Sequence, residues 1–226
     1  MNNPIQTVLF DLDGTLLDTA PDLAFALNTL LVEQKREPLP FSQIRPWVSF
    51  GSTVMIKNAF SLSDERKVPE TWRQRFLNLY EEHIADQTCL FPGMAEVLET
   101  LETNELKWGI VTNKHSSLTK PLLQKLHLTT RSVCNISGDT LSQCKPHPAP
   151  LLHACKVANT LPEYGVYVGD ASRDIEAGQR AGMRTLVALY GYIDAQETPT
   201  QWGATGILHQ PLDLLPWLAQ FTTSHS

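Results

Sequence analysis

Apolar and polar residues follow two different rhythms along the chain, and the first segment is a short apolar run. Residues 5–10 contain only Gln6 and Thr7 as polar positions, and Gly14 follows a few residues later. A run rich in Val, Leu and Phe that stops at a glycine turn is typical of a buried parallel strand. The sequence therefore predicts a first strand that ends at Phe10.

The next seventy or so residues show only helical spacing. After Pro21, apolar residues recur as Leu23, Leu27, Leu30 and Leu31, and Pro38 and Pro40 break the pattern. Further helical stretches are expected at about 52–60 and after Pro69, where one face carries Trp72, Phe76, Leu79 and Tyr80. No strand-like run separates these helices, so we expect residues 17–87 to form a separate helical insertion.

Strands and helices alternate from about residue 91 onwards. We expect helices at 94–103, 117–126, 148–159 and 172–181, strands at 107–112, 132–136, 165–169 and 184–189, then a short edge strand at 205–208 and a final helix at 212–221. Such alternation predicts right-handed crossovers and an α/β fold with a doubly wound parallel sheet. Its core would comprise residues 1–16 and 88–226.

Composition narrows the classes of partner. The chain has 226 residues, 42% hydrophobic, enough for one large core with a smaller domain beside it. The net charge is −6 and no stripe of Lys and Arg stands out, so neither nucleic acid nor a membrane surface is an expected partner. No apolar run reaches membrane-spanning length, the first residues lack a signal pattern, and the four cysteines form no Cys-x-x-Cys pair. We therefore expect a cytoplasmic protein with free thiols.

Two carboxylates stand at the end of the first strand, where open α/β sheets bind ligands. Asp11 and Asp13 are two residues apart, and the turn at Gly14 can direct their side chains differently. One carboxylate placed to attack, another placed to move a proton, and a hard cation between them suit phosphoryl transfer through an aspartyl-phosphate.

Polar residues suited to the same chemistry stand in three other places. These are Thr112 and Asn113 after an apolar strand, Lys145 before Pro146, and the run Gly169, Asp170 and Asp174. Together with Asp11–Thr15, this set resembles the four motifs of the haloacid dehalogenase-like superfamily of phosphohydrolases, in the same order and over nearly the whole chain. The superfamily's dehalogenases lack a carboxylate at the position of Asp13, which argues against cleavage of carbon–halogen bonds.

The resemblance implies a Mg²⁺ cofactor and its ligands. These would be the Asp11 side chain, the Asp13 backbone carbonyl and Asp170, with Asp174 in the outer shell. The cation would be needed because a phosphate dianion repels an anionic nucleophile, and the positive charge of the cation screens this repulsion.

The resemblance also implies how the other residues act. Asp11 would attack phosphorus, and Asp13 would protonate the leaving alcohol and then activate water. Lys145 would bring positive charge to Asp11 and the phosphoryl oxygens, while Thr112 would donate a hydrogen bond to them. Asn113 is an expected substrate-binding residue.

The insertion falls where this superfamily places a small helical cap, which closes over the substrate. Its hinges are expected at 17–19 and about 90–93. The segment 45–52 resembles the substrate-facing cap loop of the phosphoglycolate phosphatase-like group. Arg45 would meet an anionic part of the substrate, and Ser49 and Gly51 would line the loop.

The expected function is a Mg²⁺-dependent phosphatase, monomeric or homodimeric, acting on a small phosphomonoester. Segments 48–51, 108–114, 190–193 and 202–204 look more like enzymes of this group that act on N-acetylmuramic acid 6-phosphate in peptidoglycan recycling than like those that act on phosphoglycolate. Two alternatives stay open: a phosphomutase with the same motifs, and a receiver-like signalling domain that stores phosphate on an Asp. The insertion and Asp13 speak against the second, because both favour turnover.

Overall fold

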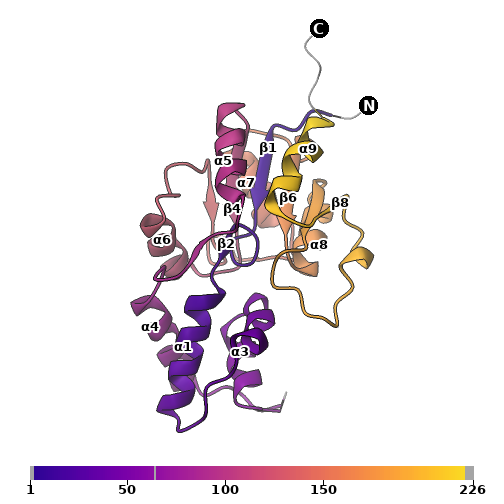
Figure 1. The fold of residues 1–226 in the computed structure, drawn as a ribbon. Helices are drawn as coiled ribbons and strands as arrows, with labels where there is room; N and C mark the ends of the chain where they lie inside the picture. The colour runs from indigo at the N-terminus through magenta and orange to yellow at the C-terminus, as the bar shows by residue number, and fades with distance from the viewer. Residues whose placement is uncertain (1–2, 64, 222–226) are drawn as a thin grey trace.

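A computed structural model describes residues 3–63 and 65–221 and contains a six-stranded sheet. The strands are β1 (Thr7–Phe10), β4 (Lys107–Val111), β5 (Asn135–Ile136), β6 (Gly165–Gly169), β7 (Arg184–Ala188) and β8 (Gly206–Leu208), in the spatial order β5-β4-β1-β6-β7-β8. Every neighbouring pair is parallel. The predicted doubly wound α/β fold is confirmed (Figure 1).

Helices pack on both faces of this sheet. They are α5 (Met94–Thr103), α6 (Ser116–Lys125), α7 (Ala149–Val157), α8 (Ser172–Arg180) and α9 (Leu214–Ala219), with 3₁₀ turns at Pro162–Tyr164, Pro199–Gln201 and Pro211–Asp213. Successive residues of a strand point to opposite faces. Accordingly, Val8 and Phe10 join one apolar cluster with Leu98 of α5, whereas Leu9 joins a second with Leu151 of α7. The central strand β1 is thus buried on both sides.

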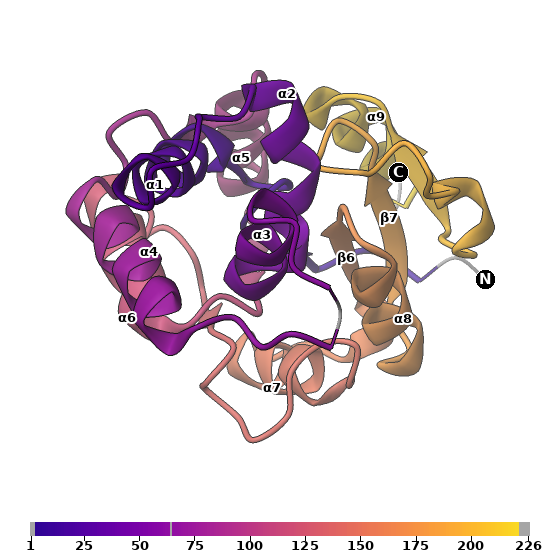
Figure 2. The same cartoon turned by 90° about the horizontal axis from the view of Figure 1, so that it is seen from below.

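The insertion forms a helical layer at the carboxyl end of the sheet, seen from below in Figure 2. Its helices are α1 (Ala20–Glu33), α2 (Phe41–Ile44), α3 (Ser52–Ala59) and α4 (Glu70–Glu82), with the 3₁₀ helix η1 (Arg45–Phe50). The short strands β2 (Leu17–Asp18) and β3 (Cys89–Leu90) pair antiparallel where the chain enters and leaves it. We propose that 17–87 is a cap that moves about this strand pair.

Three stretches differ from the sequence prediction. The short helices over 41–50 were not predicted, and Pro46 favours a helical start there because proline fixes the backbone angle of a first turn. Regular strand structure covers only Asn135–Ile136 of the predicted 132–136, and the Ser132 hydroxyl donates a hydrogen bond to the Leu128 carbonyl. The final helix starts at Leu214, after a 3₁₀ turn that Pro211 opens. In the described part of the chain, none of the helices has the length and apolar character that crossing a bilayer requires.

Candidate active site

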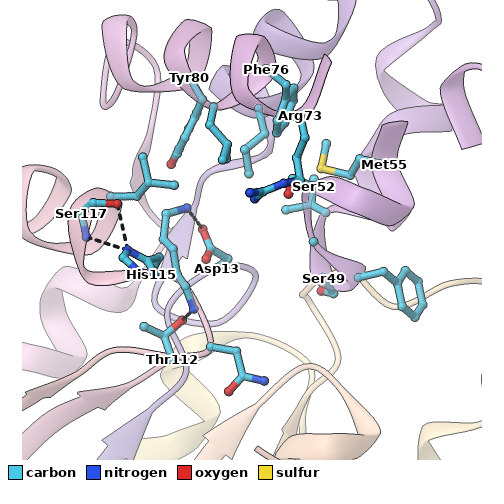
Figure 3. A pocket seen from close by; sticks show the side chains of 18 of the residues that line it. Asp13, Ser49, Ser52, Met55, Arg73, Phe76, Tyr80, Thr112, His115 and Ser117 are labelled. Carbon is cyan, nitrogen blue, oxygen red and sulfur yellow. Dashed lines mark hydrogen bonds and ion pairs between the residues drawn. The ribbon is translucent and has the colours of Figure 1, made fainter. Parts of the chain in front are cut away.

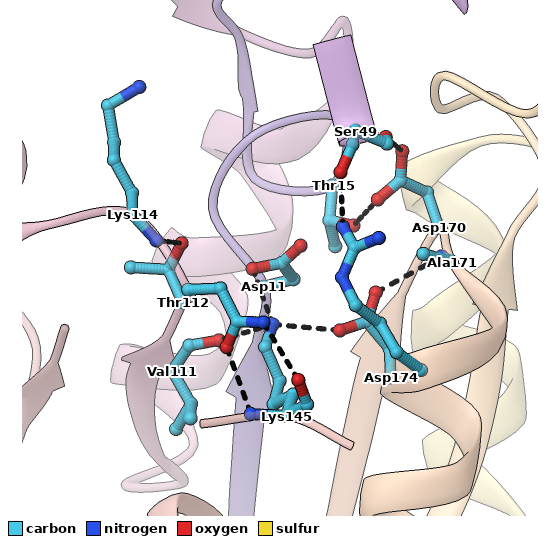
Figure 4. Close-up of polar contacts among 12 residues, drawn as sticks. Asp11, Thr15, Ser49, Val111, Thr112, Lys114, Lys145, Asp170, Ala171 and Asp174 are labelled. Atoms are coloured by element: carbon cyan, nitrogen blue, oxygen red, sulfur yellow. Dashed lines mark hydrogen bonds and ion pairs between the residues drawn. The ribbon is translucent and has the colours of Figure 1, made fainter. Parts of the chain in front are cut away.

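The predicted motifs meet at the carboxyl ends of three adjacent strands. Asp11 follows β1, Thr112 follows β4 and Asp170 follows β6, and these strands lie side by side in the order β4-β1-β6. Parallel strands bring their carboxyl ends to one edge of the sheet, so residues more than a hundred positions apart become neighbours. Figure 4 shows these side chains converging on one small volume.

Lys145 lies at the centre of this volume and is 2% exposed. Its ammonium is 2.7 Å from Asp11 Oδ1 and 2.7 Å from Asp174 Oδ1, and it donates to the Tyr167 hydroxyl (2.7 Å) and the Val111 carbonyl (3.0 Å). Burial opposes the charged ammonium, but Asp11 and Asp174 outweigh burial and raise the pKa of Lys145. The lysine is therefore a fixed positive charge beside the Asp11 carboxylate.

Asp11, Asp170 and Asp174 form a buried acidic cluster whose ligand oxygens lie within 4.8 Å of one another. Burial raises the pKa of Asp11 to about 6 and that of Asp170 to about 7. Arg173 adds a second cation, and the three carboxylates outweigh the effect of burial and raise its pKa. Three carboxylates against two cations, with oxygen donors only, fit a hard divalent cation such as Mg²⁺.

Asp170 is held from both domains. Its Oδ2 accepts hydrogen bonds from the Tyr192 N–H (2.8 Å) and from the Ser49 hydroxyl of the cap (2.9 Å), while Oδ1 accepts one from Thr15 (3.4 Å). Gly14, with φ of 84°, passes so close to Asp170 Oδ2 that a Cβ there would collide with it. This close approach explains why the turn after Asp13 needs glycine.

Asp13 points away from this cluster. Its Oδ1 accepts hydrogen bonds from the Thr19 hydroxyl (2.7 Å) and from the Lys114 ammonium (2.8 Å). The Lys114 ammonium also lies 4.5 Å from the centre of the Tyr80 ring, which belongs to cap helix α4. Asp11 and Asp13 thus have separate hydrogen-bond partners. This arrangement is compatible with the predicted roles of Asp11 as nucleophile and Asp13 as general acid and base.

Thr112 and Asn113 follow β4 and line the cavity. The Thr112 oxygen accepts a hydrogen bond from the Lys114 N–H (3.1 Å), so its own O–H can be donated elsewhere. The Asn113 amide donates to the Lys145 carbonyl (2.9 Å) and accepts from the Lys145 N–H (3.0 Å). Asn113 therefore fixes the loop that carries Lys145, and its predicted contact with substrate stays a prediction.

A cavity of about 670 Å³ opens between these residues and the cap (Figure 3). Its floor includes Asp11, Asp13 and Thr112, and its roof comes from η1, α3 and α4. The roof is partly apolar, with Val48, Met55, Phe76 and Leu77. A volume of this size accommodates a sugar-sized ligand.

The three cap residues predicted to meet substrate lie in different places. Ser49 and Gly51 line the cavity. The Arg45 guanidinium instead donates to the carbonyls of Gly191 (2.9 Å) and Tyr190 (3.0 Å) and lies over the Tyr192 ring. In this arrangement Arg45 joins cap to core, and its contact with substrate stays a prediction.

The sequence indicates no catalytic or binding role for several side chains at this site. Lys114 directly follows Thr112 and Asn113 at a strand end, and that position is the signal available. Tyr167 carries no signal, because an aromatic residue inside an apolar strand is ordinarily core. Arg73 and Tyr80 line the cavity from α4, although the apolar spacing places Tyr80 in the cap core and indicates no function for Arg73.

Comparison with known proteins identifies this arrangement. The haloacid dehalogenase-like hydrolase family matches residues 8–188. The chain belongs to that family. The match includes the four predicted motifs and the inserted helices between the first two.

Two groups of relatives cover nearly the whole chain. An N-acetylmuramic acid 6-phosphate phosphatase of Pseudomonas putida is 41% identical over 210 residues, which are 93% of this chain and 94% of that protein. A phosphoglycolate phosphatase of Xylella fastidiosa is 42% identical over 210 residues, which are 91% and 90% of the two chains. The crystal structure of a predicted phosphoglycolate phosphatase from Haemophilus somnus has a TM-score of 0.83 and 27% identity, and the match covers 94% of this chain and 97% of that one. The chain is therefore a phosphoric monoester hydrolase.

Proposed function

We propose that this phosphatase uses Mg²⁺ and hydrolyses N-acetylmuramic acid 6-phosphate through an aspartyl-phosphate. The observation that carries the mechanism is the Asp11 carboxylate, which lies 2.7 Å from the Lys145 ammonium and in one buried cluster with Asp170 and Asp174. The substrate assignment rests on the size and apolar roof of the cavity and on the likeness to relatives that bear this activity in their names.

The acidic cluster supports the assignment of Mg²⁺. The ligands would be the side chains of Asp11 and Asp170 and the backbone carbonyl of Asp13, with Asp174 outside them. When bound, the cation supplies positive charge that offsets the repulsion between Asp11 and a phosphate dianion.

The chain's own residues carry the two chemical steps. In the first, an Asp11 carboxylate oxygen forms a bond to phosphorus, the bond from phosphorus to the substrate oxygen breaks, and Asp13 gives its proton to the departing oxygen. In the second, water attacks phosphorus, Asp13 takes a proton from that water, and the bond to Asp11 breaks to release phosphate. Lys145 and the Thr112 hydroxyl hold the phosphoryl oxygens throughout.

The cavity favours the larger of the two substrates named among the relatives. Phosphoglycolate has only two carbons and would leave most of about 670 Å³ empty beneath apolar cap side chains. A hexose 6-phosphate with an N-acetyl and a lactyl group can contact both the strand ends and the cap, and binding energy from remote groups can be used in catalysis. Phosphoglycolate is the second candidate, because relatives of equal identity carry that name.

A comparison of purified wild type on both substrates, with and without chelator, tests the proposal. We expect kcat/KM to be highest for N-acetylmuramic acid 6-phosphate, activity to vanish in EDTA and to return with Mg²⁺. A higher kcat/KM for phosphoglycolate would replace the substrate assignment and leave the mechanism intact. Full activity after exhaustive chelation would contradict the metal assignment, and formation of a sugar-phosphate isomer without free phosphate would indicate a mutase.

The cellular setting and the assembly stay predictions. A cytoplasmic location stays a prediction, and it suits an enzyme that acts on a phosphorylated metabolite. A monomer or a homodimer is expected, and sedimentation of the purified protein measures which of the two forms.

A further inference from the structure

Helix α4 presents one face to the cavity over two turns. Arg73, Phe76, Leu77 and Tyr80 are spaced by three, four and seven residues, which places them on one side of a helix, and all four line the cavity. Figure 3 shows the side chains of Arg73, Phe76 and Tyr80 directed into it from the cap. This face therefore contacts whatever part of the substrate lies beyond the phosphate.

The C-terminal end of this face marks the reacting end of the cavity. Tyr80 lies against Lys114, whose ammonium is bound to Asp13. Burial raises the pKa of Tyr80 to about 12, and the Lys114 ammonium beside it works in the opposite direction. Tyr80 and Lys114 thus form one contact between the cap and the strand end that carries Thr112.

Arg73 lies at the opposite end of the same face. Seven residues of α-helix span about 10 Å, so the backbones of Arg73 and Tyr80 lie about two turns apart, and Figure 3 shows the Arg73 guanidinium extending from α4 into the cavity. Between Tyr80 and Arg73, α4 lines the cavity with the apolar side chains of Phe76 and Leu77 and the polar side chains of Gln74 and Asn78. A ligand that satisfies this face has a phosphate at one end, a ring-sized body, and an anion at the other end.

The other cationic side chains near the cavity are already bound to carboxylates or to backbone carbonyls. Lys114 is paired with Asp13, and Arg173 lies among the three carboxylates and donates to the Ser49 carbonyl (2.7 Å). Arg45 is bound to carbonyls outside the cavity. Among the described residues that line the cavity, Arg73 is the cation that the cap contributes.

Arg73 already holds the Glu70 carboxylate in a bidentate contact. Its Nε and Nη2 donate to Glu70 at 3.0 and 2.7 Å, and the two side chains are 38% and 70% exposed. Exposed pairs of this kind are weak, so a substrate carboxylate can displace Glu70 or add beside it. The Glu70 contact shows that a carboxylate fits the guanidinium in this position.

From these contacts we infer that Arg73 binds the carboxylate of the lactyl group, while Glu70 competes for the same guanidinium. The inference rests on the proposed function and assigns its specificity to one ion pair on α4. Phosphoglycolate cannot use Arg73, because its carboxylate lies within a few bonds of the ester oxygen and stays near Asp13.

The two members of the pair should act in opposite directions. Arg73→Ala should lower kcat/KM for N-acetylmuramic acid 6-phosphate by about ten- to a hundredfold, the range for a hydrogen bond to a charged group. It should leave N-acetylglucosamine 6-phosphate nearly unchanged, because that sugar has no lactyl carboxylate. Glu70→Gln should lower KM for the lactyl sugar by about two- to threefold, because the neutral Gln side chain no longer competes with the lactyl carboxylate for Arg73. Arg73→Lys should keep only part of the wild-type activity, because lysine keeps the positive charge but cannot make the bidentate contact of a guanidinium.

Arg75→Ala is the matched control. Arg75 lies on the same helix, is similarly exposed and is paired with Glu33 and Glu82. It does not line the cavity, so both sugars should be hydrolysed as by wild type. Retained hydrolysis of N-acetylglucosamine 6-phosphate by Arg73→Ala shows that the variant is folded and able to turn over substrate.

The possible failures are distinguishable. If wild type hydrolyses the two sugars equally well, the proposed substrate is wrong and the inference is wrong with it. If wild type prefers the lactyl sugar and Arg73→Ala keeps that preference, the proposed function stands and the role of Arg73 is overturned. A loss in Arg75→Ala equal to that in Arg73→Ala would also overturn it, because it would trace to helix stability.

Discussion

The two halves of the active site are built differently. In the core, Lys145, Asp174 and Asp11 are at most 5% exposed at their side chains, and each charge has a partner within 2.7 Å. In the cap, Arg73 is 38% exposed and its partner Glu70 is more exposed still. Buried, fully partnered charges hold one geometry, whereas exposed pairs exchange partners at little cost. If the proposed roles hold, the sheet fixes the geometry of the reacting groups, while the cap surface that contacts the substrate can change without disturbing that geometry.

Hydrogen bonds around Ser49 and Arg45 join the two halves. Ser49 of the cap donates to Asp170, Arg173 of the core donates to the Ser49 carbonyl, and Arg45 of the cap donates to carbonyls of residues 190–191. The Tyr192 hydroxyl extends this contact to β2, where it donates to Asp18 (2.6 Å). Cap position and the placement of Asp170 are therefore linked.

The largest effect is expected from Asp11, the proposed nucleophile of the core. Asp11→Asn should lower kcat by at least about a thousandfold on every phosphomonoester, because an amide cannot form the acyl phosphate. The measurement is phosphate release on both amino sugars and on an aryl phosphate, with circular dichroism and a melting curve to check folding. Near-normal turnover by the folded variant would overturn the division of labour between core and cap.

The next effect separates the two core aspartates. Asp13→Asn should lower kcat by about 10²–10⁴-fold for sugar phosphates, because it removes the proton donor for a poor leaving group. Aryl phosphates need less help from an acid and should lose much less. Parallel kinetics on a sugar phosphate and an aryl phosphate measure this difference, and equal losses on both would show that Asp13 is not the acid.

The contrast between the core and the cap also explains which parts of the site could be predicted from the sequence. The strand-end residues were predictable because the chemistry requires their types at fixed places: Asp11 and Asp13 before Gly14, Lys145 in a loop, and Asp170 after a strand. The family match confirms the class that these residues indicated.

The cap was less predictable. The insertion shows in the helical spacing of its apolar residues, but the direction in which each polar side chain points depends on how the helices dock. Arg45 and Arg73 look alike in the sequence, yet one turns to backbone carbonyls and the other lines the cavity. The short helices over 41–50 were missed because they are too brief to show a period.

Arg45 tests whether the contacts between cap and core matter for all substrates. Arg45→Ala removes two charge-assisted hydrogen bonds that join the cap to the core, so kcat/KM should fall by about tenfold for both amino sugars alike. A substrate-binding role would instead lower kcat/KM for the lactyl sugar alone. The ratio of the two kcat/KM values in this variant measures which role applies, and Arg75→Ala again serves as the control.

The smallest effect concerns the stability of the metal-free core. Carboxyl groups ionise near pH 4 in an unfolded chain, whereas burial raises the pKa of Asp11 to about 6 and that of Asp170 to about 7. Protonated carboxyls therefore favour the fold at low pH, and that stability is lost as the pH rises from about 4 through 7. In EDTA, Tm should fall by about 2 °C or more between about pH 5 and pH 7.5.

Asp170→Asn, which carries no charge to bury, should show a smaller fall in Tm over the same range. Saturating Mg²⁺ should raise the Tm of wild type more at the higher pH, because the cation and protons compete for the same oxygens. Melting curves at the two pH values, with and without Mg²⁺, measure all three effects. If the Tm of wild type in EDTA stays constant or rises over this pH range, the buried carboxyl groups of the core are not the destabilising charges that a cation would neutralise. An unchanged slope in Asp170→Asn would assign the pH dependence to groups elsewhere in the chain.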